Sequence, residues 1–336
     1  MRPEKRRTGA IAAPPMREQY GFDPTHGMDL ESLLAVHPPE YEPPDLDSFW
    51  ARVANEASEL DSELEVGEWV SLEGEPGVQV ADVRYSSLDG IRIGGWLTRP
   101  LGGVTRGLVV GHGYGGRDAP DVTGIPSDAV ALFPVARGLP SRSDVDGVGG
   151  GTGMHHVLWG IRSPRGYSHV GSVVDTWLAA RMLRELFPRL RRVDYLGSSF
   201  GGGIGALAIG FGDCFDAGVL EVPSFGHHAW RISVPSTGSA RIVAEHVFDR
   251  PEAMDTLSYV DAACAARRVR VPMLVLPALA DPSVPTPGQF AIANALDGPT
   301  WMHVLAHGHC AGGDGCDDGR RDDTIAEFLE GLPKDA

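Results

Sequence analysis

A serine framed by glycines, between a strand-like run and a run of small residues, constrains this chain more than any other feature. The segment reads Gly197-Ser-Ser-Phe-Gly201, a G-x-S-x-G pattern, with the apolar run 193–196 before it and small residues at 202–208 after it. A sharp strand-to-helix turn lifts a serine hydroxyl above a sheet, and glycines two residues away remove side chains that would collide there. Ser199 is therefore the candidate nucleophile. The alternative is an ordinary glycine-rich turn, because short patterns arise by chance.

Short apolar runs recur along the chain, as in buried parallel strands. Helical patterns lie between several of them, most clearly from Val173 to Phe187, where Pro188 ends the helix. The runs occupy 107–110, 129–135, 193–196, 217–220 and 273–276. The alternation predicts right-handed crossovers and an α/β fold with a doubly wound, mostly parallel sheet. The active site of such a sheet lies at the carboxyl ends of its strands.

Two further strands, 78–85 and 91–97, are joined by a turn at Leu88–Gly90 and predict an antiparallel N-terminal hairpin. Residues 1–44 carry many prolines and charges without a sustained period, so we expect a partly irregular N-terminal extension without catalytic residues. Residues 45–336 then form a single catalytic domain. Its first helix begins near Asp45, with Asp47 or Ser48 as the expected cap.

Composition narrows the class of protein. The 336 residues are 42% hydrophobic and 22% charged, as in soluble globular proteins, and the net charge of −16 disfavours nucleic acid or an anionic membrane as partner. Arg189, Arg191 and Arg192 are interpreted as a solvated helix end. No apolar run approaches the ~20 residues of a membrane span, and no secretory segment is evident, so we expect a cytoplasmic protein.

A serine nucleophile needs a histidine base, which in turn needs a carboxylate partner. In α/β-hydrolases the order along the chain is serine, acid, histidine. Asp281 directly follows the apolar strand that begins at Met273, and His309 lies in a glycine-rich loop beyond the last strand. These two are the chosen acid and base. The sequence leaves rivals open for both roles. Asp255 and Asp261 are the other candidate acids and are expected to be surface or capping carboxylates. His303, which is expected to pack within its strand, and His307 are the other candidate bases.

The histidine-rich tail has two other interpretations. It could be a loop without a catalytic role, or His307, His309, Cys310 and Cys316 could bind zinc, but their spacing lacks the regularity of metal sites. We expect neither a metal nor an organic cofactor. Four cysteines are too few to stabilise a domain of this size by disulfide bonds. Only Cys310 and Cys316 lie close enough in sequence to pair locally.

An oxyanion hole needs two donors aimed at the substrate's carbonyl oxygen. The backbone N–H of Phe200, directly after the nucleophile, supplies the first. The second is expected from the loop Gly111-His-Gly-Tyr-Gly-Gly116, with Tyr114 as donor and His112 shaping the turn. A plain glycine turn is the alternative for this loop.

From Asp45 to the C-terminus the chain resembles the acetylxylan esterase and cephalosporin-C deacetylase family, carbohydrate esterase family seven. The segments that carry the resemblance are Leu46-Asp-Ser-Phe-Trp50, 87–97, His112-Gly-Tyr-Gly-Gly-Arg117, Arg137-Gly138, Glu221-Val-Pro-Ser-Phe225, 257–261 and Ala280-Asp-Pro-Ser-Val-Pro285. The resemblance implies an α/β-hydrolase fold, Ser199, Asp281 and His309 as triad, Tyr114 and Phe200 as oxyanion donors, and removal of acetate from small substrates. Family members often form closed rings, so a homo-oligomer is possible.

Three positions depart from the family pattern, with Leu139 and Phe200 in place of glutamines and Cys310 in place of a glutamate. None removes a triad residue, but Phe200 keeps the backbone donor while making the pocket wall more apolar, so acyl and alcohol preference can differ. The loops 138–169 and 225–251 are expected to form the lid of the pocket.

The sequence thus predicts a serine esterase that deacetylates a small acetylated sugar or a cephalosporin-type acetate through an acyl-enzyme. One alternative is a peptidase of the prolyl-oligopeptidase type, which usually carries a large extra domain. The other is a binding protein with a hydrolase fold and no catalysis.

Overall fold

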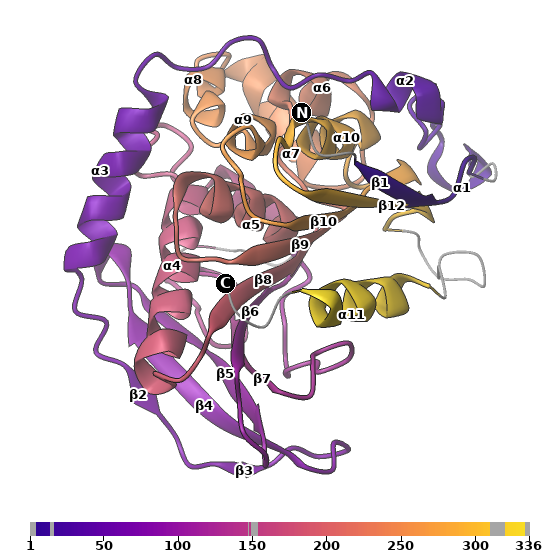
Figure 1. Cartoon of the computed structure of the whole chain (residues 1–336). Coiled ribbons are helices and arrows are strands. Elements are labelled where there is room, and N and C mark those ends of the chain that lie inside the picture. Colours follow the sequence, from indigo (N-terminus) through magenta and orange to yellow (C-terminus); the bar gives the residue numbers. More distant parts are fainter. Residues whose placement is uncertain (1–4, 14–16, 147, 149–153, 310–319, 333–336) are drawn as a thin grey trace.

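In the computed structural model, which describes residues 5–13, 17–146, 148, 154–309 and 320–332, a sheet of twelve strands runs through the molecule (Figure 1). Its main order is β1-β12-β10-β9-β8-β6-β7-β5-β4-β2. The parallel strands are β6 (Arg106–Gly111), β7 (Ala129–Pro134), β8 (Arg192–Ser198), β9 (Ala217–Glu221), β10 (Met273–Leu276), β12 (Thr300–His307), β1 (Arg6–Gly9) and the short β11 (Ala278–Ala280). The predicted mostly parallel α/β sheet is confirmed.

The antiparallel end of the sheet contains the predicted hairpin. Strands β4 (Val78–Ser86) and β5 (Arg92–Pro100) pair in antiparallel fashion across a single 3-10 turn, η1 (Leu88–Gly90). Two short strands, β2 (Glu65–Val66) and β3 (Val70–Ser71), add to β4. The turn requires a left-handed backbone at Asp89, with φ of 64°. Small polar residues tolerate that conformation better than bulky ones.

Helices cover both faces of the sheet, and the sheet separates two hydrophobic cores. The larger core lies under α3 (Leu46–Glu59), α4 (Ser168–Leu186), α5 (Phe200–Phe211), α9 (Ala262–Ala266) and α10 (Thr286–Ala295), and the smaller core lies under α11 (Arg321–Gly331). Val109 faces the larger core and its neighbours Leu108 and Val110 the smaller one, as alternation along a strand requires. The remaining helices are α1 (Arg17–Tyr20), α2 (Leu30–Leu34), η2 (Met154–Leu158), α6 (His228–Ser233), α7 (Ser239–Asp249) and α8 (Ala253–Ser258).

The N-terminal residues contribute to the sheet. Strand β1 lies parallel to β12, with Arg6 opposite Trp301 and Gly9 opposite Val304. Gly9 has φ of +96°, and a Cβ there would meet the backbone of Val304, so this position needs glycine. Backbone pairing therefore joins the N-terminal region to the last strand of the sheet.

Two local expectations were wrong. Helix α3 is preceded by Asp45, and neither Asp47 nor Ser48 caps it, since both lie inside the helix. Arg189 and Arg191 are exposed as expected, but Arg192 is buried in β8, where its guanidinium binds Asp194 with a nitrogen-oxygen distance of 2.7 Å. Arginine and aspartate two residues apart share one face of a strand, so the pair neutralises itself inside the sheet.

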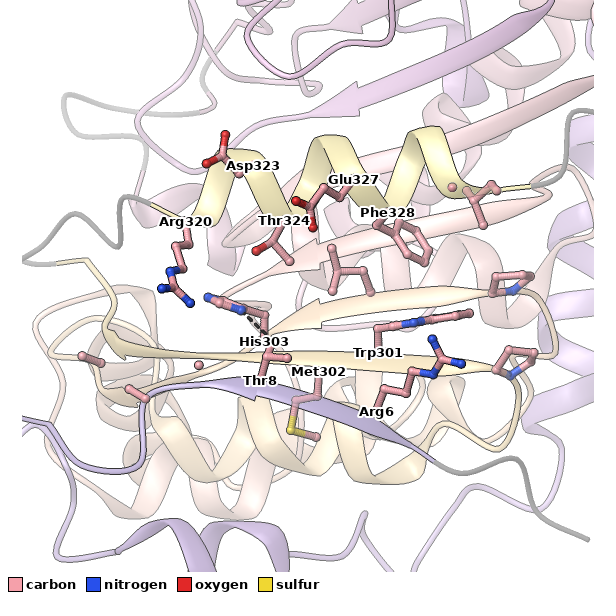
Figure 2. A pocket seen from close by; sticks show the side chains of 18 of the residues that line it. Arg6, Thr8, Trp301, Met302, His303, Arg320, Asp323, Thr324, Glu327 and Phe328 are labelled. Atoms are coloured by element: carbon pink, nitrogen blue, oxygen red, sulfur yellow. Dashed lines mark hydrogen bonds between the residues drawn. The ribbon is translucent and has the colours of Figure 1, made fainter.

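A large groove of about 1320 Å³ lies between α11 and the edge of the sheet (Figure 2). Asp323 and Glu327 of α11 line it on one side, and Trp301 and His303 of β12 on the other. Ser199 is not among its lining residues, so this groove is separate from the candidate nucleophile. Within the described part of the chain, no helix is both long and apolar enough to cross a membrane.

Candidate active site

Ser199 stands in a strained turn between β8 and α5. Its φ of 55° and ψ of −114° fall outside the regions that residues with a side chain prefer, and its side chain is almost buried, with 9% of the residue exposed. A Cβ at Gly197 would lie 2.6 Å from the carbonyl oxygen of Gly201, and a Cβ at Gly201 would lie 2.8 Å from the backbone of Gly111. The glycines therefore permit this turn, as the motif predicts.

Hydrogen bonds of the backbone hold the strained turn in place. The N–H of Ser199 donates to Glu221 O at 2.9 Å, and the carbonyl of Ser199 accepts from Gly203 and Ser224, each at 3.0 Å. Phe200 is the first residue of α5, so its N–H has no partner within the helix and lies at the positive end of the helix dipole. That is the geometry an oxyanion donor needs.

The loop after β6 lies against the serine. A Cβ built on Gly113 would be 3.5 Å from the Cβ of Ser199 and 3.9 Å from its Oγ. His112 shapes the loop, since its Nδ1 donates to Gly113 O at 2.7 Å and its Nε2 accepts from the N–H of Ala136 at 2.9 Å. Burial, with the charge of Arg117, lowers the pKa of His112 to about 4 and keeps the ring neutral. Tyr114, the expected second donor, follows Gly113 directly.

Asp281 and His309 contact each other just beyond the ends of β11 and β12. His309 Nδ1 lies 2.8 Å from Asp281 Oδ2, and Asp281 is completely buried. Burial acts to lower the pKa of His309, but the charge of Asp281, its hydrogen bond and the charge of Glu221 outweigh it and raise the pKa above the usual 6.5. The side chain of His309 keeps 25% of its surface exposed, so the ring can exchange a proton with substrate or water.

Three groups that the sequence did not single out fix the Asp281 carboxylate. Oδ1 accepts from the N–H groups of Ser283 and Val284 at 2.8 and 2.9 Å, and Oδ2 accepts from Gln289 Nε2 at 2.9 Å. The backbone N–H donors are those of a turn that begins at an aspartate, which Asp281-Pro-Ser-Val could have suggested. Gln289 comes from α10 and carried no local signal.

Gly308 allows the base to approach the acid. A Cβ at this position would lie 2.4 Å from Asp281 Oδ2, closer than atoms that are not bonded can come. The N–H of Gly308 donates to Ala280 O at 2.9 Å, which anchors the end of β12 beside Asp281. His309 itself has a left-handed backbone with φ of 46°.

The N-terminal region also contacts the candidate acid. The N–H of Asp281 donates to Pro24 O at 3.0 Å. His26 Nε2 donates to Pro235 O at 3.1 Å, and its Nδ1 lies 3.3 Å from Thr286 Oγ1. The turn at 23–26 thus links the segment that follows Asp281 to the loop at Pro235. No pattern in the sequence predicts that residues of the N-terminal extension lie here.

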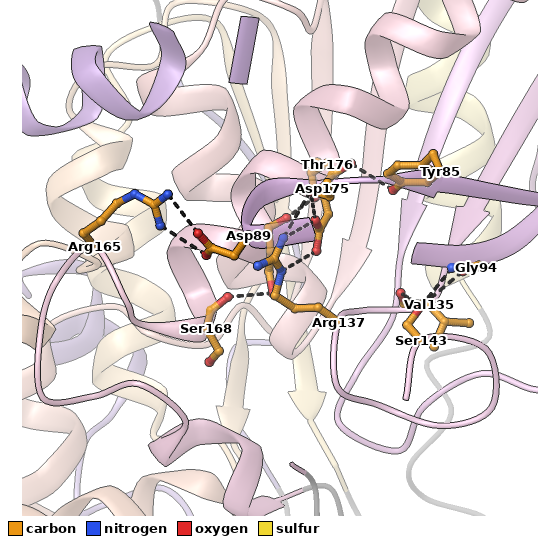
Figure 3. A network of polar contacts seen from close by, with 12 residues as sticks. Tyr85, Asp89, Gly94, Val135, Arg137, Ser143, Arg165, Ser168, Asp175 and Thr176 are labelled. Atoms are coloured by element: carbon orange, nitrogen blue, oxygen red, sulfur yellow. Dashed lines mark hydrogen bonds and ion pairs between the residues drawn. The ribbon is translucent and has the colours of Figure 1, made fainter. Parts of the chain in front are cut away.

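Arg137, one of the residues that carry the family resemblance, ties the segment after β7 to α4 through Asp175 (Figure 3). Its guanidinium binds both oxygens of Asp175 at 2.8 and 2.6 Å and donates to Ser87 Oγ at 3.1 Å. The carbonyl of Arg137 accepts from His156 Nε2 at 2.7 Å. Leu139, one of the departures from the family pattern, is buried in the smaller core.

The rival residues have structural roles where the structure describes them. Asp261 caps α9 by accepting from Ala263 and Cys264 N–H, and Asp255 is exposed. His303 is buried in β12, with its Nδ1 2.9 Å from Thr8 Oγ1. His307 ends β12, and the hydrogen bond to Asp281 comes from His309. Cys310 and Cys316 lie outside the described residues.

Comparisons with known proteins agree with this architecture. A model of the acetyl xylan esterase (AXE1) family matches residues 24–318. Among solved structures, acetyl xylan esterases from Paenibacillus sp. R4 and Thermoanaerobacterium sp. JW/SL YS485 superpose with TM-scores of 0.79 and 0.76 at 22% and 21% identity. The alignments cover 91% and 92% of this chain and 100% and 99% of theirs.

A Pyrococcus horikoshii acylaminoacyl peptidase is less similar, with a TM-score of 0.60 at 16% identity. Its alignment covers 84% of this chain but only 44% of the peptidase. At these identities the superpositions show a shared α/β-hydrolase fold. The family match spans most of the chain and does not favour the peptidase alternative. The chain therefore belongs to the acetyl xylan esterase family and is an esterase of the α/β-hydrolase type.

Proposed function

We propose that this protein is a serine esterase that removes acetyl groups from small acetylated substrates, with Ser199 as nucleophile, His309 as base and Asp281 as its partner. The observation that carries the proposal is the combination of a strained Ser199 at the start of α5 with a 2.8 Å contact between Asp281 and His309. Acetylated sugars and cephalosporin-type acetates are the proposed substrates. A cytoplasmic location and a homo-oligomer belong to the same proposal.

In the proposed reaction, Ser199 Oγ attacks the ester carbonyl and passes its proton to His309 Nε2. Backbone N–H groups of Phe200 and Tyr114 stabilise the oxyanion. His309 then protonates the leaving alcohol, and the acetyl group stays on Ser199. Water, deprotonated by His309, attacks the acyl-enzyme and releases acetate. The negative charge of Asp281 stabilises the imidazolium in both steps.

The first test is hydrolysis of p-nitrophenyl acetate, butyrate and octanoate at neutral pH by the wild type, Ser199→Ala and Ser198→Ala. Ser198 is the matched control, because it is the adjacent serine and has no role in the proposed chemistry. We expect rates that fall with acyl length and a loss of at least about 10³-fold in kcat for Ser199→Ala. Full activity of Ser199→Ala would contradict the assignment, and an inactive wild type would favour a binding role.

A pH profile tests the base. His309 must be neutral to accept a proton, so kcat/KM should fall as the pH decreases through the pKa of His309. Because that pKa is raised, the fall should begin above pH 6.5. A rate that is constant between pH 5 and 8 would exclude His309 as base.

A further inference from the structure

Four buried nitrogen atoms of residues that lie near one another have no hydrogen-bond partner within the described part of the chain. They are Nδ1 of His156, His169 and His228 and one Nη of Arg231. The exposed fractions of these residues are 0%, 0%, 2% and 2%. Native proteins pair the great majority of buried polar atoms, so several unpaired atoms in one region point to a polar ligand or to water. We call these four residues the His-Arg cluster.

Contacts between aromatic rings connect the cluster to Phe200, the residue that follows Ser199. The rings of His156 and His169 each lie 5.8 Å from that of Phe200, between centroids. The ring centroid of Phe225 lies 4.2 Å from that of His169 and 5.8 Å from that of Phe200. The guanidinium carbon of Arg231 lies 5.1 Å from the ring centroid of Phe225. These contacts therefore connect three of the four cluster residues, His156, His169 and Arg231, to Phe200.

Tyr114, whose backbone N–H is the second proposed oxyanion donor, contacts the cluster through its side chain. Its ring lies 4.6 Å from Phe200, and its hydroxyl lies 3.1 Å from His169 Nε2. Burial raises the pKa of Tyr114, so the hydroxyl keeps its proton and can donate it to His169. In that arrangement His169 Nδ1 carries a hydrogen and becomes a donor.

The only formal charge in the cluster belongs to Arg231. His156 and His228 donate through Nε2 to backbone carbonyls of Arg137 and Val260, and burial lowers their pKa values to about 4 and about 3. Both rings are therefore neutral at physiological pH. Burial likewise lowers the pKa of His169 well below its usual value.

Arg231 lacks the carboxylate partner that a buried guanidinium normally has. Its hydrogen bond within the described residues goes to the neutral Ser239 Oγ at 2.9 Å, and it forms no ion pair there. Asp261 contributes a favourable charge, but its oxygens accept from backbone N–H groups of His227, His228, Ala263 and Cys264. A buried, unpaired charge destabilises a fold, so an anion at this place would be bound favourably.

The proposed reaction suggests which substituent of the substrate would face the cluster. In that reaction the ester's carbonyl oxygen lies between the N–H groups of Phe200 and Tyr114, and the leaving oxygen lies beside His309. The acyl chain is the remaining substituent, and the printed contacts of His156 and His169 are with Tyr114 and Phe200 rather than with His309. The four residues lie on η2, α4 and α6, within the segments 138–169 and 225–251 that the sequence predicts to form the lid of the pocket.

We propose that the His-Arg cluster is an acyl subsite that binds a terminal carboxylate, so that half-esters of dicarboxylic acids are substrates as well as acetyl esters. Arg231 pairs with the carboxylate, and His169 donates a second hydrogen bond to it. The lone pairs of His156 and His228 accept from water that accompanies the anion. This inference rests on the proposed function and extends it to a second class of acyl group.

The test compares p-nitrophenyl hydrogen glutarate and adipate with p-nitrophenyl pentanoate and hexanoate, which have the same acyl lengths without the charge. The enzymes are the wild type, Arg231→Met, Arg231→Lys and Arg241→Met, an exposed arginine on α7 that serves as control. We expect the wild type to prefer at least one half-ester about tenfold or more in kcat/KM. Arg231→Met should lower this preference at least about tenfold, Arg231→Lys should keep part of it, and Arg241→Met all of it.

A second measurement does not depend on the variants folding. Free adipate should inhibit wild-type hydrolysis of p-nitrophenyl acetate more strongly than hexanoate does. Equal inhibition, together with no preference for either half-ester, would overturn the subsite while leaving the proposed esterase intact. A preference that persists in folded Arg231→Met would also overturn it. If the wild type hydrolyses none of the esters, including acetate, the proposed function fails and the subsite fails with it.

Discussion

The Asp281 side of the candidate site and the Phe200 side are built in opposite ways. Both oxygens of Asp281 accept hydrogen bonds, from two backbone N–H groups, Gln289 and His309. In the His-Arg cluster, by contrast, four buried nitrogen atoms have no partner within the described residues. A group that acts in every turnover is best fixed in advance, whereas a group that binds a substrate keeps its polar atoms available. The comparison therefore separates the part that is proposed to perform the chemistry from the part that is proposed to select the acyl group.

The largest expected effect comes from Asp281→Asn. Gln289 Nε2, His309 Nδ1 and the N–H groups of Ser283 and Val284 all donate hydrogen bonds to the carboxylate. The NH₂ group of an asparagine would face some of these donors and could not accept from them. We expect kcat to fall roughly 10³- to 10⁴-fold, as for a triad whose histidine is held in the wrong tautomer. Steady-state kinetics on p-nitrophenyl acetate measures it, with exposed Asp255→Asn as control. Near-normal activity of Asp281→Asn would remove Asp281 from the proposed triad.

The next effect separates the two sides by the sign of their pH dependence. The cluster histidines have lowered pKa values in the folded state, so their contribution to stability is present above pH 6.5 and is lost as the pH decreases toward about 4. Three such groups can remove up to about 4 kcal/mol of unfolding free energy per pH unit. His309, whose pKa is raised, has the opposite sign, and its contribution is lost as the pH rises through that pKa.

Urea unfolding at pH 7, 6 and 5 checks this prediction. His156→Gln, which retains a donor for the Arg137 carbonyl, should reduce the slope by about 1.4 kcal/mol per pH unit. The exposed His37→Gln should leave it unchanged. Equal slopes for the wild type and His156→Gln would show that His156 titrates alike in the folded and unfolded states.

A smaller effect is expected from Gln289→Met, which deprives Asp281 Oδ2, Ala278 N–H and Val284 O of a partner. Leaving such groups unpaired should lower the free energy of unfolding by roughly 2–4 kcal/mol. The looser carboxylate should lower kcat about tenfold, the equivalent of about 1.4 kcal/mol. Phe290→Leu, next to it on α10, is the control that should lower stability without lowering kcat. If both variants keep full kcat, Gln289 is only a packing residue.

The smallest effect concerns His26. His26→Ala removes contacts with Pro235 O and Thr286 Oγ1, so the segment after Asp281 can shift slightly. We expect kcat to fall about three- to tenfold, less than the roughly 10² that a displacement of 1 Å can cost. His26→Gln, which keeps a donor and an acceptor, should recover most of the loss. Identical kinetics for all three proteins would show that the N-terminal turn does not position the acid.

The same comparison shows how far sequence reasoning reaches. Ser199, the strand before it and the pairing of Asp281 with His309 were predictable, because local motif and chain order determine which groups meet at the strand ends. The contacts of Pro24 and Gln289 with Asp281, and those of His26 with Pro235 and Thr286, were not predictable, because they depend on the folding of distant segments and carry no local pattern. The prediction for Arg192 was wrong for a related reason: its polarity indicated exposure to solvent, but Asp194 on the same strand face neutralises it.

The cluster lay beyond prediction for a different reason. Its residues lie on η2, α4 and α6, which only the tertiary fold brings together. In addition, arginine is usually exposed, so its sequence position gave no indication that Arg231 is buried. Phe200 was expected to make the pocket wall more apolar. Its ring is indeed buried, but it packs against the rings of His156, His169 and Tyr114. The surroundings of Phe200 are therefore partly polar.

The pairing of β1 with β12 has a consequence for the order in which a cell completes this enzyme. Arg6 is synthesised almost 300 residues before its partner Trp301, and His309 follows Trp301. Strands β6 and β8 and the turn at Ser199 are available for folding long before His309 is made. During synthesis the nascent chain therefore carries the proposed nucleophile without the proposed base. The proposed site is complete only after β12 has been made and can pair with β1.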